Sequence, residues 1–152
     1  MRFTATEEYG VRCLVQMVRE PGRLWTIGDV AKREGLTRAY AAKLMAALGR
    51  ARLVTATRGR SGGFRLAPKT EDLDLSTVLR ALDGPLYAEP EFCGKHTGTQ
   101  RVCVHTTDCN IRGLWRAVDG AVQRTLSRTR LRDLLGPERA MLGAPVATPA
   151  VG

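Results

Sequence analysis

Apolar side chains recur every three or four positions near the start of the chain, which predicts an amphipathic first helix. Thr6 can cap this helix, and the pair Pro21-Gly22 ends it. Its apolar face contains Tyr9, Cys13, Leu14, Met17 and Val18. Cys13 therefore lies on the side that faces the core, where we expect a small buried thiol.

Two further helices follow, joined by a short turn. The second is predicted over 27–34 behind a Thr26 cap, and the third runs from Thr37 to about Arg50. The turn between them contains Gly35. Two helices joined by a few residues that include glycine are typical of a helix-turn-helix motif. The third helix is expected to bury Tyr40, Leu44, Met45 and Leu48 and to expose Arg38, Lys43 and Arg50.

Two strands are predicted next, at 53–57 and 64–66. The tip between them reads Arg58-Gly59-Arg60-Ser61-Gly62-Gly63 and is both basic and rich in glycine. Glycine lets a backbone approach another surface closely, and arginine suits the narrow, electronegative minor groove of DNA. An ordinary hairpin with a flexible tip is the alternative. Directly after a helix-turn-helix, however, the hairpin is typical of a winged-helix domain.

Beyond the hairpin, a short helix is predicted over 75–82 and a long irregular loop over 86–109. Loops of such length are usually functional or disordered. A long helix begins at about Asn110, and its apolar residues are Ile111, Leu114, Trp115, Val118, Val122 and Leu126. This is the seam spacing of paired helices. Because one small lobe cannot easily bury so long a stripe, we expect homodimerisation through this helix, with intramolecular packing as the alternative.

The end of the chain carries weaker patterns. Thr129 can cap a last short helix that contains Leu131, Leu134 and Leu135. The chain then divides into a winged helix-turn-helix DNA-binding domain at 1–69, a short helix and cysteine-bearing loop at 70–109, a dimerisation helix with a short C-terminal helix at 110–135, and a tail at 136–152 that we expect to be disordered. The predicted fold is mainly α with a small β-hairpin wing.

The distribution of charge points to the kind of partner that the chain binds. The net charge is +9, and residues 1–69 contain 14 lysines and arginines against 5 acidic residues, whereas the remainder is balanced. Cations concentrated in one half favour a polyanionic partner, of which double-stranded DNA fits a helix-turn-helix. No apolar run is long enough to span a bilayer, so no membrane partner is expected. The N-terminus lacks a signal-peptide pattern, which favours a cytoplasmic location and cysteines that are thiols or ligands.

Three of the four cysteines lie close together, at Cys93, Cys103 and Cys109, with His96 and His105 among them. Structural zinc sites usually show paired ligands two to four residues apart followed by a second pair, and this arrangement is missing. Iron–sulfur clusters tolerate irregular spacing. From the residues alone an iron–sulfur cluster, a zinc site and a metal-free thiol switch all remain open.

The patterns of common enzyme sites are missing. The glycine-rich tip lies between strands rather than before a helix, and no Gly-Lys-Ser/Thr triplet follows it, so a phosphate-binding loop is disfavoured. No nucleophile motif with a Ser/His/Asp constellation is visible. We therefore expect neither an enzyme nor a small-molecule substrate.

Several segments match one known family. They are MRFTATEEYG, GLTRAYAAKLMAAL, RGRSGGFRLA, VLRALDG, LWRAV and RTRLRDLL, together with the three cysteines. From Met1 to about Leu135 the chain resembles the Rrf2 family of winged-helix transcription regulators, which includes the iron–sulfur sensors IscR and NsrR. The resemblance implies a homodimer that binds palindromic operator DNA under the control of a [2Fe–2S] or [4Fe–4S] cluster.

The resemblance also implies a ligand set. Three cysteines bind the cluster in such members and match Cys93, Cys103 and Cys109, although the first gap is wider here. IscR-like proteins use a histidine three residues after the third cysteine, and that position is Arg112. NsrR-like proteins use a carboxylate on the first helix of the partner subunit, and that position is Glu8. Glu8 is therefore the expected fourth ligand, with His96 or His105 as the fallback.

The expected DNA contacts follow from the predicted helix-turn-helix and wing. Thr37 and Arg38 are expected to approach bases, Lys43 and Arg50 phosphates, and Arg58 and Arg60 the minor groove. The full set of expected DNA-binding residues is Thr26, Thr37, Arg38, Ala39, Tyr40, Lys43, Arg50, Arg58, Arg60, Ser61 and Gly62. Two alternatives remain, namely a zinc-bound or metal-free thiol-dependent regulator of the same fold and a cluster-assembly accessory protein that does not bind DNA.

Overall fold

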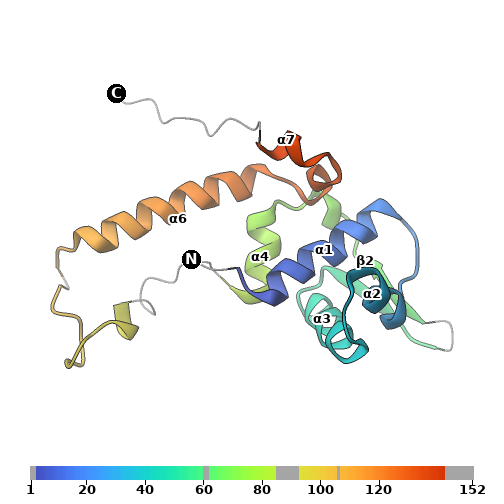
Figure 1. Ribbon diagram of the computed structural model, residues 1–152, viewed down its shortest axis with the longest axis horizontal. Coiled ribbons are helices and arrows are strands. Elements are labelled where there is room, and N and C mark those ends of the chain that lie inside the picture. The colour runs from blue at the N-terminus through green and yellow to red at the C-terminus, as the bar shows by residue number, and fades with distance from the viewer. Residues whose placement is uncertain (1–2, 60–61, 85–92, 106, 143–152) are drawn as a thin grey trace.

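The computed structural model describes residues 3–59, 62–84, 93–105 and 107–142, and it shows a helical lobe with one long helix reaching away from it (Figure 1). The elements are α1 (Ala5–Arg19), α2 (Ile27–Glu34), α3 (Arg38–Arg50), β1 (Val54–Thr57), β2 (Gly63–Leu66), the 3-10 turn η1 (Thr70–Asp72), α4 (Leu75–Asp83), α6 (Asn110–Arg128), the 3-10 turn η2 (Leu131–Leu135) and α7 (Glu138–Leu142). The fold that was predicted, mainly α with a hairpin wing, is confirmed.

The first helix begins two residues earlier than its sequence suggested. Thr4, not Thr6, is the cap: its hydroxyl accepts from the Glu7 backbone N–H, and the Glu7 carboxylate accepts from the Thr4 N–H at 2.7 Å. This reciprocal capping box satisfies two backbone donors at once, and it requires an acid three residues after the cap. Thr6 has no such acid, since Tyr9 stands at that position.

The core lies where α1, α3 and α4 meet. Its buried members include Cys13, Leu14, Met17, Trp25, Val30, Ala41, Leu44, Met45, Leu48, Leu53, Val54, Leu75, Val78 and Leu131. At Gly10 the backbone of α1 is so close to α4 that an added Cβ would lie 2.8 Å from Leu82. The second contact between these helices is polar, because the Thr4 hydroxyl donates to the Asp83 carboxylate at 2.5 Å. The N-terminal half of α1 is therefore held against the C-terminal end of α4.

The hairpin pairs β1 and β2 antiparallel, with Val54 opposite Leu66 and Thr57 opposite Gly63. Trp25, in the segment before α2, adds a bridge to Phe64 through two backbone hydrogen bonds of 2.8 Å. The indole of Trp25 is fully buried, and the Arg23 guanidinium stacks 4.2 Å from its ring centre. The wing is thus fixed to the helix-turn-helix at its base.

The end of the chain differs from its prediction. Thr129 ends α6 instead of capping a new helix, and the Asp133 carboxylate accepts from the Arg130 N–H at the start of η2. Leu131 of η2 and Leu14 of α1 are both fully buried, and both belong to the same core cluster. Part of the expected disordered tail forms α7, a segment of good helix formers that begins after Pro137. Residues 143–152 lie outside the described part of the chain.

Among the described residues, no helix combines the length and the apolar character needed to cross a membrane.

Candidate DNA-binding surface and cysteine-bearing segment

The turn between α2 and α3 is fixed by local chemistry. Thr26 caps α2 in a reciprocal box with Asp29, and Gly35 closes the helix with φ +66°, a backbone conformation that favours glycine. The hydroxyl of Thr37 then accepts from the Tyr40 N–H at 3.2 Å and starts α3. The helix-turn-helix predicted from the spacing is confirmed, with both predicted caps in place.

One side of α3 is exposed over its whole length. The exposed residues are Arg38, Ala39, Ala42, Lys43, Ala46, Gly49 and Arg50, whereas Ala41, Leu44, Met45 and Leu48 are buried on the opposite side. Arg38 lies against Gly28 of α2, where an added Cβ would be 3.0 Å from its guanidinium. Tyr40 is half-buried, because its ring packs edge-on against Tyr9 of α1 at 5.9 Å. Tyr40 thus joins α3 to α1.

Several cations near α1 and α2 form ion pairs within the lobe. On the side of α1 and α2, Arg12 pairs with the buried Glu34 at 2.8 Å, and Arg33 pairs with Glu20 at 3.0 Å. Arg23 pairs with Glu20 and with Asp29. By contrast, Arg38, Lys43, Arg50, Arg58 and Arg65 form no ion pair within the described residues. The cations of α3 and the wing, like Arg19 of α1 and Lys32 of α2, thus have no carboxylate within ion-pair distance in the described part of the chain.

The wing leaves little room for side chains at its tip. Gly59 has φ +118°, and a Cβ at Gly62 would lie 2.4 Å from the Thr57 carbonyl oxygen. Arg58 is exposed beside this turn. Arg60 and Ser61 lie outside the described residues, so the structure leaves their expected DNA contacts untested.

The cysteine-bearing segment lies at the far end of α6, away from α1–α3 (Figure 1). Cys93, Cys103 and Cys109 are free thiols, each half-buried. Cys109 is also the cap of α6, because its sulfur accepts from the Arg112 N–H at 3.4 Å. Across the described ranges, three or more metal-binding side chains do not converge on one point. A single chain therefore does not gather the predicted ligands.

Arg112 has a role that sequence reasoning missed. Its guanidinium donates to the backbone carbonyls of His105 and Thr107, both at 3.5 Å. Arg112 thereby holds the residues before Cys109 against the first turn of α6. The signal available in the sequence was a long cation three residues after a cap position, but the cap itself is a cysteine, which few helices use.

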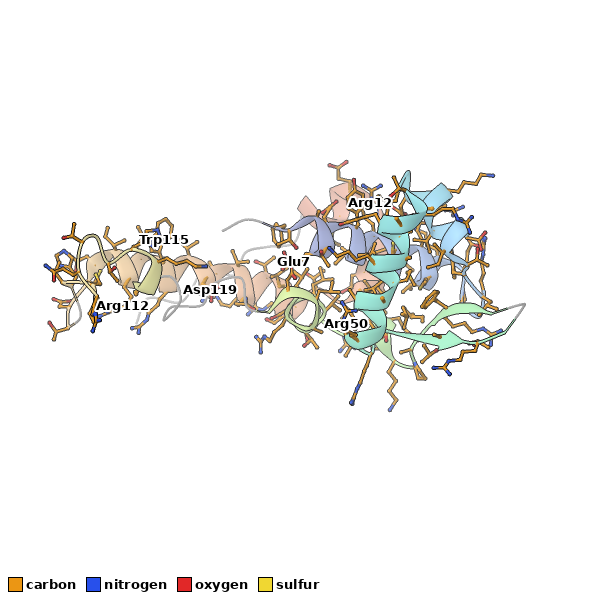
Figure 2. All side chains as sticks on the ribbon, turned by 90° about the horizontal axis from the view of Figure 1, so that it is seen from below. Glu7, Arg12, Arg50, Arg112, Trp115 and Asp119 are labelled. Atoms are coloured by element: carbon orange, nitrogen blue, oxygen red, sulfur yellow. The ribbon has the colours of Figure 1, made fainter. Side chains whose placement is uncertain are left out.

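The other candidate ligands are accessible. Glu8 is exposed in the first turn of α1, and His96 and His105 are exposed in the cysteine-bearing segment. Figure 2 shows Glu7, the neighbour of Glu8, well apart from Arg112. Glu8 and the three cysteines are thus not brought together within one chain.

Cys13 belongs to a different environment. It is 2 % exposed in the core, and burial, reinforced by the nearby Glu34 carboxylate, raises the pKa of its thiol to about 12. A thiol that keeps its proton is a poor metal ligand, since the thiolate is the ligand. The prediction of a core role for Cys13 is confirmed.

The N-terminal part of α6, which extends beyond the lobe (Figure 1), carries exposed apolar side chains. Ile111 is 59 % exposed and Leu114 is 52 % exposed, and no residue of α6 is buried. Near its C-terminal end, α6 instead packs on α4, where the Ser76 hydroxyl donates to Gln123 at 2.5 Å. The predicted apolar stripe is thus covered at one end only.

Comparison with known proteins agrees with this architecture. The Rrf2 family, described as "Iron-dependent Transcriptional regulator", matches residues 3–137. The protein named rrf2 of Nitratidesulfovibrio vulgaris is 30 % identical over 154 residues, which cover 97 % of this chain and 99 % of that protein.

Two solved structures share the fold. CymR (YrzC), the global cysteine regulator of B. subtilis, matches with a TM-score of 0.69 at 23 % identity over 88 % of this chain and 95 % of that one. IscR of T. potens matches with a TM-score of 0.66 at 24 % identity over 89 % of this chain and 86 % of that one. Rrf2 proteins are DNA-binding transcription regulators, generally dimeric, and not enzymes. On its sequence match and its winged helix-turn-helix fold, this chain belongs to the Rrf2 family of transcription regulators.

Proposed function

We propose that this transcription regulator is a homodimer whose binding to a palindromic operator is controlled by an iron–sulfur cluster. The observation that carries the proposal is the set of three half-buried free thiols, Cys93, Cys103 and Cys109, on one segment that leads directly into α6. Soft thiolates are the usual ligands of such clusters. Whether the cluster is [2Fe–2S] or [4Fe–4S] is for iron and sulfide counts to decide.

The chemistry of these residues fits a cluster. The N-terminus of α6 is the positive end of a helix dipole and favours an anionic sulfur at Cys109. The Arg112 N–H already donates to that sulfur, and hydrogen bonds to ligand sulfurs tune clusters. When bound, a cluster supplies a centre that changes with redox state, nitric oxide or iron supply.

The fourth ligand that we propose is Glu8 of a second subunit. Within one chain Glu8 is exposed and lies on a different part of the molecule from the cysteines. A dimer formed through the uncovered part of α6 would bring the cysteine-bearing segment of one chain near the lobe of the other. A carboxylate is a weaker partner for iron than a thiolate, so this ligand would be the labile one. His96 and His105 remain the fallback.

Contacts within the lobe can carry a change at Glu8 to the DNA. Glu8 is on α1, whose Tyr9 packs on Tyr40 of α3. The same helix is tied to the end of α4 through Thr4 and Asp83, just before the segment that leads to the cysteines. In a dimer, the two copies of α3, the second helix of each helix-turn-helix, must meet half-sites about 34 Å apart. A small shift of α1 and α3 therefore alters affinity.

The test is anaerobic purification followed by iron, sulfide and zinc counts, an absorption spectrum and operator binding before and after chelation. We expect iron and sulfide in stoichiometric amounts and a difference in DNA affinity between the two forms. Colourless protein without iron would contradict the proposal. Zinc at one atom per chain would instead identify the zinc-bound regulator.

A metal-free thiol regulator is the second candidate. It is favoured by the three free, half-buried thiols, which water can reach. In that case chelators would leave operator binding unchanged, whereas a thiol oxidant followed by a reductant would change it reversibly.

A further inference from the structure

The DNA-binding half of the chain is poor in side-chain amides. Residues 1–69 contain no asparagine and a single glutamine, Gln16. The side-chain oxygen of Gln16 accepts from Arg33 at 3.3 Å on the α1–α2 side of the lobe. Asparagine and glutamine are the side chains that read adenine through two hydrogen bonds. This half therefore lacks an amide for that purpose.

Carboxylates, which accept from the amino group of cytosine, are also committed elsewhere. Of the five acidic residues in 1–69, four have partners: Glu7 in the α1 cap, Glu20 with Arg23 and Arg33, Asp29 in the α2 cap, and Glu34 with Arg12. The fifth, Glu8, is on α1. The exposed side of α3 contains no acidic residue.

What α3 does present is donors and methyl groups. Arg38, Lys43 and Arg50 carry N–H groups, and Ala39, Ala42 and Ala46 carry methyl groups. The oxygen of Thr37 accepts from the Tyr40 N–H, which leaves the hydroxyl proton to donate. In the major groove the matching partners are the O6 and N7 acceptors of guanine and the methyl group of thymine.

We propose that α3 reads guanine and thymine in each half-site and makes no contact with the amino groups of adenine or cytosine. Arg38, in the first turn, donates to guanine O6 and N7, because the N-terminal residues of a recognition helix face base edges. Ala39 and Ala42 pack against thymine methyl groups. Lys43 and Arg50 bind phosphates at the margins. This inference rests on the proposed operator binding and places α3 in the major groove, as in other helix-turn-helix proteins.

The first experiment selects duplexes from a random pool with the purified full-length protein and then replaces single bases in the selected site. Guanine to 7-deazaguanine removes N7 and should weaken binding about tenfold at the position read by Arg38. Thymine to uracil removes one methyl group and should weaken binding about fourfold. Replacing guanine by hypoxanthine removes the 2-amino group but keeps O6 and N7 in the major groove, so the contact with Arg38 should be retained at the same position.

Variants identify the side chains. In Arg38→Ala the 7-deazaguanine effect should disappear, and in Ala42→Gly the uracil effect at one thymine should disappear. Arg128→Ala, which removes a cation from α6, should retain both effects. Each binding measurement is made with as-purified and with chelated protein. The effect of losing the cluster is thereby separated from the effect of losing a base contact.

Two results would overturn the inference. Full tolerance of 7-deazaguanine and uracil, with Arg38→Ala weakening all sequences equally, would show that α3 binds phosphates only, while DNA binding and cluster control still stand. A selection that returns no motif, or affinity unchanged by Arg38→Ala and Lys43→Ala, would show that α3 is not the reading helix.

Discussion

At the scale of single residues, burial separates the four cysteines into two kinds. Cys13 is enclosed by the core, whereas Cys93, Cys103 and Cys109 are half-buried on the segment before α6. Water keeps access to the second group, which leaves those thiols open to metal or oxidant. Cysteine thus serves as a packing residue at position 13, whereas the three later cysteines remain available for chemistry.

The thiol of Cys13 gives a prediction about alkaline stability. Its pKa is about 12 in the folded protein and 9.0 in an unperturbed thiol. Between these values unfolding releases a proton, so the folded state loses about 1.4 kcal/mol per pH unit from this group as pH rises. Urea unfolding of the wild type and of Cys13→Ala from pH 8 to 11 should show the steeper decline in the wild type. Parallel declines would contradict this account.

At the scale of elements, the tip of the wing is closely packed, whereas the N-terminal part of α6 is uncovered. In the wing the constraint is lack of space, since Gly62 approaches the Thr57 carbonyl too closely for a side chain. In α6 it is lack of cover, since the helix extends beyond the lobe with Ile111 and Leu114 exposed (Figure 1). The role of each element can therefore be tested by a substitution outside the hydrophobic core.

Gly62→Ala should disrupt the wing. The added methyl group forces the hairpin tip to move, at a cost of about 1–3 kcal/mol, and operator affinity should fall because Arg58 moves with the tip. Gly113→Ala on α6, where nothing lies within 4 Å of the new Cβ, is the matched control. Circular dichroism should report unchanged helix content for both variants. Unaltered DNA affinity in Gly62→Ala would remove the wing from the DNA-binding surface.

Ile111→Arg and Leu114→Arg should prevent dimerisation. A charge in the centre of an apolar interface costs about 2–4 kcal/mol, so sedimentation should detect monomers at concentrations where the wild type is dimeric. Ser127→Arg, on another side of the same helix, is the control and should stay dimeric. Dimers in all three variants would assign the apolar face of α6 to a partner other than a second copy.

At the scale of the whole molecule, the proposed cluster ligands lie in two separate parts of the chain. The cysteine-bearing segment is at one end of α6, and α1, with Glu8, is part of the lobe (Figure 1). The exposed apolar residues Ile111 and Leu114 lie on α6 next to the cysteine-bearing segment. A dimer formed through these residues is the simplest arrangement in which both ligand groups contribute to one site.

Mixed dimers can test this arrangement. One subunit carries Glu8→Ala and its partner carries Cys93→Ser, Cys103→Ser and Cys109→Ser. If each site combines cysteines of one chain with Glu8 of the other, the mixed dimer contains one complete site, and iron retention after mild oxidation should be about half that of the wild type. If both ligand groups came from one chain, no complete site would exist, and the mixed dimer should retain no more iron than Glu8→Ala alone.

The sequence by itself determined the helix-turn-helix, the hairpin, the charge asymmetry and the family, because periodicity, caps and turn residues act within a few positions of one another. Thr26, Gly35 and Thr37 each act on their own neighbours, and their roles are as expected. The one cap that was predicted wrongly, Thr6 in place of Thr4, also depends on a local contact, namely the reciprocal hydrogen bonds between Thr4 and Glu7.

Only the tertiary structure decided the long-range contacts. The bridge from Trp25 to Phe64, the bond from Thr4 to Asp83 and the burial of Leu131 against α1 join segments whose local patterns carry no sign of one another. The same holds for the cysteines. Spacing placed them on one segment, but their separation from Glu8 depends on how far α6 reaches beyond the lobe, and that is a property of packing.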